Sequence, residues 1–134
     1  MSTSDFNKYA KEFLTRMEES FPQEQKIKQY NFQFDMIRKM NSRKPVEMFM
    51  ESLAPFGLQI MTKNEEFFRK DKYVKNVQTL SGKMGLVNYW ENMPIPSKDS
   101  IWHYMQALYV LGMGALDRKD ELKIILDQVH SQNP

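Results

Sequence analysis

The residue best suited to acid–base or metal chemistry is His103, which stands in the stretch SKDSIWHYMQALYVLGMG from Ser97 to Gly114. A histidine becomes catalytic or ligating when a second histidine or a carboxylate shares its helical face. Only Asp99, four residues earlier, meets that spacing. We therefore expect a structural or surface role for His103, and also for His130, whose charge suits a helix C-terminus.

Other patterns that could carry catalysis are equally incomplete. Glu65 and Glu66 are adjacent, and neighbouring helical side chains diverge by about 100°, so they cannot act as a facing acid and base. The chain has no cysteine and no phosphate-binding loop motif. We predict no catalytic residue, no metal ligand and no cofactor. An enzyme would need a pocket that joins His103 to Glu91 or Asp99.

Two basic clusters could instead bind nucleic acid. Lysine and arginine neutralise phosphates, and aromatic rings beside them stack on bases. A net charge of +2 is too small to indicate such a partner by itself, so this role requires the two clusters to meet on one face. The first cluster is Arg38, Lys39, Arg43 and Lys44, and the second is Arg69, Lys70, Lys72 and Lys75, interleaved with Phe67, Phe68 and Tyr73.

The abundance of methionine and aromatic residues points to a third kind of site. The chain has 11 Met and 13% aromatic residues, side chains that suit adaptable apolar interfaces. The predicted protein-interaction residues are Trp90, Trp102 and Tyr109, together with the NMPIP strip at 92–96. The helix that carries Trp102 and Tyr109 has apolar residues on nearly all of its sides, so the sequence leaves open whether it belongs to the core or to an interface.

Helices must position these residues, because apolar side chains recur every three or four positions through most of the chain. The first predicted helix has Ser4 or Asp5 as its cap and ends at Pro22, and the second runs from Pro22 to Met40. The third runs from a cap at Asn41 or Ser42 to Pro55 and Gly57, and the fourth begins after a cap at Asn64. The fifth runs from a cap at Ser97 or Asp99 to a left-handed end at Gly112 or Gly114, and the last runs from Asp117 to about residue 130. The first two should form an antiparallel hairpin. The apolar face of the second is Ile27, Tyr30, Phe34, Ile37 and Met40.

The pattern is weakest from 78 to 98, which contains two glycines and two prolines. We expect this segment to be irregular and residues 131–134 to fray. The alternative for the irregular segment is a short strand through Leu86, Val87, Tyr89 and Trp90.

Length and composition indicate one domain. A chain of 134 residues with 41% hydrophobic residues can bury a single core, and its mean hydropathy of −0.64 and short apolar runs exclude a membrane-spanning helix. Its charged N-terminus does not resemble a secretory signal, so we expect an intracellular protein. We predict an all-α fold, a single compact domain over 1–134 with five or six helices. The predicted Met- and aromatic-rich core is Phe13, Met17, Phe34, Ile37, Phe49, Leu53, Ile60, Ile101, Met105, Leu108, Ile125 and Leu126.

Two segments, VEMFMESLAPFGLQIMTKNEEFF at 46–68 and SIWHYMQALYVLGMG at 100–114, carry a resemblance. They resemble an uncharacterised group of small helical proteins of nucleocytoplasmic large DNA viruses, the giant viruses, in which an EEFF-like box precedes a helix with the pattern W.YLQ.LY.LG. The chain departs from that pattern at His103 and Met105, where a lysine and a leucine are expected. The matching residues are Glu66, Phe67, Phe68, Ile101, Trp102, Tyr104, Gln106, Leu108, Tyr109 and Gly112.

The resemblance implies a setting, not a reaction: a viral protein in the cytoplasm or nucleus of an infected host cell, or in the virion. Together with the missing catalytic signature, it predicts a non-catalytic helical protein that binds another viral or host protein in a virion-structural, assembly or host-interaction role. The alternative is a nucleic-acid accessory protein for viral transcription or genome packaging that uses the basic clusters. Oligomeric state is left open.

Overall fold

Every regular element of the computed structural model, which describes residues 3–65, 84–86 and 89–132, is a helix. The α-helices are α1 (Thr3–Ser20), α2 (Gln25–Met40), α3 (Lys44–Leu53), α4 (Gly57–Met61), α7 (Ile95–Ala115) and α8 (Lys119–Gln132), and the 3₁₀ helices are η1 (Ala54–Phe56) and η4 (Trp90–Asn92). The predicted all-α class is therefore confirmed. None of the described helices is long and apolar enough to cross a membrane.

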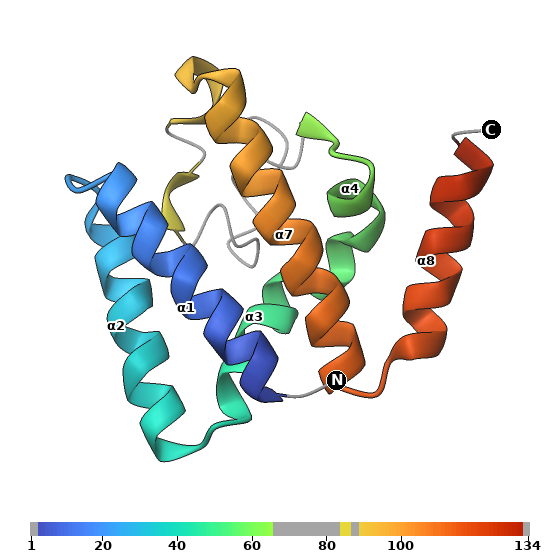
Figure 1. The fold of residues 1–134 in the computed structure, drawn as a ribbon, viewed down its shortest axis with the longest axis horizontal. Helices are drawn as coiled ribbons and strands as arrows, with labels where there is room; N and C mark the ends of the chain where they lie inside the picture. Colours follow the sequence, from blue (N-terminus) through green and yellow to red (C-terminus); the bar gives the residue numbers. More distant parts are fainter. Residues whose placement is uncertain (1–2, 66–83, 87–88, 133–134) are drawn as a thin grey trace.

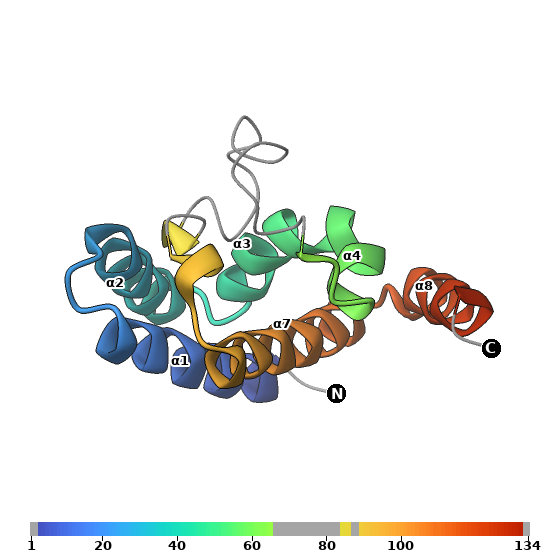
Figure 2. The same cartoon turned by 90° about the horizontal axis from the view of Figure 1, so that it is seen from above.

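The helices form a single compact domain in two layers. In one layer α1 and α7 lie side by side and antiparallel, and in the other α2, α3 and α4 pack behind them (Figures 1 and 2). The helices α1 and α2 form the predicted antiparallel hairpin. The last helix, α8, lies at the edge of the molecule, where it contacts α4 and α7.

The core between the two layers is rich in aromatic rings and methionines. Phe49 of α3 is fully buried at its centre, with its ring edge-to-face against Phe6, Tyr30 and Phe34 at centroid distances of 5.6, 5.3 and 6.0 Å. Such edge-to-face pairs add to the stabilisation from burial alone. The predicted core residues that are buried are Phe13, Met17, Phe34, Phe49, Leu53, Ile60, Ile101, Met105 and Leu108.

Three predicted core residues are less buried than expected, although Ile125 still packs against the core. Ile37 on α2 and both Ile125 and Leu126 on α8 are only partly buried. The reason is the position of their helices at the rim of the fold, where one side of each helix meets solvent. A helical period in the sequence identifies an apolar face but not how much of that face a neighbour covers.

Local chemistry explains the helix starts. Glu24 is the N-cap of α2, and its carboxylate accepts a hydrogen bond from the N–H of Lys26, so the helix begins three residues after Pro22. Asn41 accepts from the N–H of Arg43 at 3.0 Å just ahead of α3, whose first turn holds Pro45 as predicted. The first helix begins at Thr3, so Ser4 and Asp5, the two predicted caps, lie inside it.

The helix α7 is longer than predicted at both ends. It begins at Ile95, so that Pro96 lies in its first turn, and it runs through Gly112 and Gly114 to Ala115. The residue that ends it in a left-handed conformation is Asp117, with φ of 58°, and the N–H of the following residue bonds back to the carbonyl of Met113 at 2.8 Å. This is a Schellman-type cap on an aspartate, whereas the sequence had predicted a glycine.

Other boundaries also differ. Because Asp117 caps α7, α8 begins at Lys119, and it continues through Gln132, into the predicted frayed tail. The expected irregular segment contains η4 and the first turn of α7, and the described Leu86, Tyr89 and Trp90 form no strand. The helix expected from Asn64 lies almost entirely outside the described residues, as does Val87.

Candidate functional site

The three aromatic residues predicted to bind a partner protein are core residues instead. Trp90, Trp102 and Tyr109 are 2%, 3% and 0% exposed, and the two indole rings meet edge-to-face with centroids 5.6 Å apart. The helix α7 carries two of them and packs on α1, α3 and α4, so nearly every side of it is covered. In the adjoining strip Met93 is also buried, and only Ile95 is a large exposed apolar residue.

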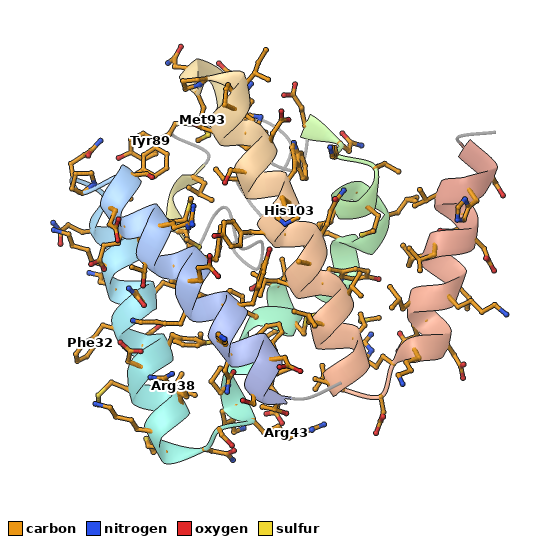
Figure 3. The ribbon with its side chains drawn as sticks, in the orientation of Figure 1. Phe32, Arg38, Arg43, Tyr89, Met93 and His103 are labelled. Atoms are coloured by element: carbon orange, nitrogen blue, oxygen red, sulfur yellow. The ribbon has the colours of Figure 1, made fainter. Side chains whose placement is uncertain are left out.

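The first basic cluster is split between different surfaces. Arg38 lies 3.7 Å from Asp35 on the side of α2 that meets α1, with its guanidinium over the ring of Phe34 (Figure 3). Lys39 is exposed on another side of the same helix, since adjacent helical residues diverge by about 100°. Lys44 pairs with Glu47 at 3.2 Å, and Arg43 is exposed at the start of α3.

The second basic cluster lies outside the described residues. Arg69, Lys70, Lys72 and Lys75 all fall within 66–83. Whether the two clusters share a face therefore stays a prediction. The ion pairs at Arg38 and Lys44 already reduce the charge that the first cluster could offer to phosphates.

His103 is exposed on α7, and its ring lies edge-on to Tyr104 with centroids 6.3 Å apart (Figure 3). It lines none of the four hollows identified on the described residues, and neither do Glu91 and Asp99. No three His, Asp or Glu side chains of the described part of the chain gather closely enough to hold a metal ion. His103 is thus a surface residue, which is one of the two roles predicted for it.

One hollow, of about 720 Å³, lies between α1 and the start of α7. Its charged lining has both signs, and Glu12 and Arg16 face each other at 3.6 Å. Glu12 also accepts a hydrogen bond from the hydroxyl of Tyr104 at 3.1 Å, and Lys11 bonds Asp35 at 2.8 Å. Glu12 and Lys11 thus already have partners within the protein, and their bonds connect α1 to α7 and α2.

The burial of tyrosines in this core predicts that the protein loses stability at alkaline pH. Burial raises the pKa of Tyr30, Tyr104 and Tyr109, and the hydrogen bond to Glu12 raises the pKa of Tyr104 further. A raised pKa in the folded state means that the stabilisation is complete below the unfolded value of about 10 and is lost as pH rises above it.

We therefore expect the free energy of unfolding, measured with urea, to fall between about pH 10 and 11 as phenolate absorbance rises. Tyr30→Phe should make this fall shallower, because it removes the most strongly shifted phenol. Tyr89→Phe is the comparison: burial and Glu24 also raise the pKa of this partly buried tyrosine, but less than that of Tyr30, so the slope should change less. An equal slope in the wild type and Tyr30→Phe would contradict the assignment.

A row of exposed apolar side chains on α2 is a site that sequence reasoning missed. Phe32, Met36 and Met40 are 66%, 49% and 84% exposed and follow one another at four-residue intervals, so they lie on consecutive turns. Phe32 points away from the domain (Figure 3). We call Phe32, Met36 and Met40 the α2 row. The sequence pattern had placed Met40 on the same apolar face as Tyr30 and Phe34.

A groove runs beside this row, between α2 and α3. One hollow of about 440 Å³ is lined by Ile37, Met40 and Met48, with Lys44, Glu47 and Glu51 at its edges. A second hollow, of about 270 Å³, shares Met48 and extends toward the N-terminal half of α2. We call the two hollows together the α2–α3 groove. The α2 row and the groove meet at Met40, so they form one continuous surface.

The sequence did hold a signal for the α2 row. Phe32 and Met36 repeat at the same interval as Tyr30 and Phe34 but point to a different side of the helix. A helix with two apolar sides needs two neighbours. Among the described helices α2 makes its principal contacts with α1 and α3, and the side chains on its second side are exposed.

No family model, curated protein or solved structure matches this chain. The resemblance to the viral group therefore rests on the two sequence segments alone and stays a prediction.

Proposed function

We propose that this protein is a non-catalytic helical domain that binds another protein through the α2 row and the α2–α3 groove. One observation supports the proposal above the others: three large apolar side chains are exposed on consecutive turns of one helix, beside an apolar hollow. Exposed apolar patches of this kind are typical of protein interfaces. Methionine suits such a surface, because its flexible side chain adapts to a partner.

The viral setting is part of the proposal and is supported by the sequence resemblance at 46–68 and 100–114. In that setting the partner would be a viral or host protein in the virion or the infected cell. A nucleic-acid accessory role has weaker support, because Arg38 and Lys44 already pair with neighbouring acids.

The proposal is tested by photo-cross-linking in cells that produce the protein. A photoreactive phenylalanine analogue at position 32 is expected to give a protein adduct of defined mass. The matched control places the analogue at Ile124 of α8, another large apolar side chain, which is 58% exposed. Adducts that are the same at both positions, or absent at position 32, would count against an interface on α2.

A further inference from the structure

We propose that the occupant of this surface is an amphipathic helix of another protein, with acidic residues on the flank that faces α2 and basic residues on the flank that faces α3. The inference rests on the proposed function and adds the chemistry of the partner. It follows from the charges on either side of the α2 row and the α2–α3 groove.

The edge of the surface formed by α2 is basic. Lys28 and Lys39 are exposed and lie eleven residues apart, close to three full turns, so both flank the row on the same side. Among the described residues neither forms an ion pair. The single acid of α2, Asp35, faces α1, where it bonds Lys11 at 2.8 Å. Two positive charges are thus left available along this edge.

The edge formed by α3 is acidic. Glu47 and Glu51 are exposed, lie one turn apart and line the hollow of about 440 Å³. Glu47 is shared with Lys44, but no ion pair to Glu51 is formed by the described residues. Lys26 lines the second hollow, so the acidic edge is confined to the hollow of about 440 Å³. At that hollow the apolar strip runs between a basic edge and an acidic edge, and a bound helix meets opposite charge only when its two flanks differ in sign.

The dimensions suit a helix. From Phe32 to Met40 the row spans about 12 Å, two helical turns, and an amphipathic helix presents its own apolar anchors at the same interval. The hollow between Met40 and Met48 can take one large apolar side chain of such a helix.

The same charges argue against two other occupants. In a dimer whose two α2 helices pack antiparallel across a two-fold axis, Lys28 of one copy would face Lys39 of the other, and the two positive charges would repel. In a dimer whose α2 helices pack parallel, the two helix dipoles would be aligned unfavourably. An anionic membrane would attract Lys28 and Lys39, but Glu47 and Glu51 would be repelled by the same surface.

The probe is a designed helical peptide with leucines on one face, glutamates along one flank and lysines along the other. Its control has the same composition, with glutamates and lysines mixed on both flanks. Each peptide is titrated into the isotopically labelled protein and binding is followed by NMR. The first peptide should shift the amide signals of α2 and α3, and it should bind at least several-fold more tightly than the control peptide. Equal affinity for the two peptides would overturn the charge assignment.

Charge reversal on the protein gives the second readout. The double variant K28E/K39E should bind the first peptide, whose charges are separated onto two flanks, about fivefold more weakly, because two exposed ion pairs are lost. The control K119E/K123E makes the same change of net charge on α8 and should bind this peptide as tightly as the wild type does. Tighter binding to phosphatidylserine vesicles than to the peptide, or concentration-dependent self-association through α2, would overturn the proposal in favour of those occupants. If cross-linking at position 32 succeeds and the charge tests fail, the protein-binding function stands and only the partner's chemistry is wrong.

Discussion

Phe49→Ala should lower the free energy of unfolding by about 3–5 kcal/mol, the largest effect that we expect from a single substitution. Phe49 is fully buried and its ring contacts Phe6, Tyr30 and Phe34, which come from α1 and α2. Its removal leaves a cavity where three helices meet and breaks three edge-to-face ring contacts. In a domain of this size, the melting temperature should fall by roughly 10–15 °C.

The matched control for this change is Phe32→Ala. It removes the same side chain from the exposed α2 row, where the ring is 66% accessible to solvent, so we expect the free energy of unfolding to stay within about 0.5 kcal/mol of the wild type. Urea unfolding followed by circular dichroism measures both variants. Similar losses for the two would mean that Phe32 packs in the core and that the α2 row is not an open surface.

Gly57→Ala should lower the free energy of unfolding by about 1–3 kcal/mol, although alanine is the better helix former. Gly57 begins α4 directly against the side chain of Tyr109, and a methyl group there would overlap the tyrosine hydroxyl and lie 2.6 Å from Cζ. Tyr109 is fully buried, so its rigid ring has no free space to enter. The measurement is again equilibrium unfolding in urea.

The double variant Gly57→Ala, Tyr109→Phe separates this overlap from other causes. Removing the hydroxyl relieves the closest contact but leaves Cζ, so the double variant should recover part of the lost stability. Tyr109→Phe alone should not lower stability, because the hydroxyl has no hydrogen-bond partner among the described residues. A loss in the double variant equal to the sum of the single losses would show that Tyr109 is not the obstacle.

The helical class and most of the core were predictable from the sequence. Apolar spacing alone identified the buried faces of α1 and α3, including Phe13, Met17 and Phe49, because a helix with a single apolar side must bury that side. The proline and asparagine signals near α2 and α3 also marked their starts to within a few residues, because cap chemistry is local.

Helix ends that depend on tertiary packing were harder to predict. Gly112 was expected to end α7, but in the structure it lies inside the helix, where the absence of Cβ makes room for the side chain of Met50. The sequence of α7 does not contain that neighbour, which comes from α3. A glycine needed for close packing and a glycine needed for a left-handed turn look alike in one sequence.

By itself, the sequence determined that this protein is helical, which faces of its helices are apolar and that its charges are mixed. Only the tertiary structure decided that Trp102 and Tyr109 are covered while Phe32 and Met36 are open. The physical reason is that the hydrophobicity of a side chain is set by its own chemical structure, whereas its burial depends on which other parts of the fold pack against it. The helix α7 has neighbours on nearly every side, and α2, at the edge of the domain, has apolar side chains on one side that are exposed.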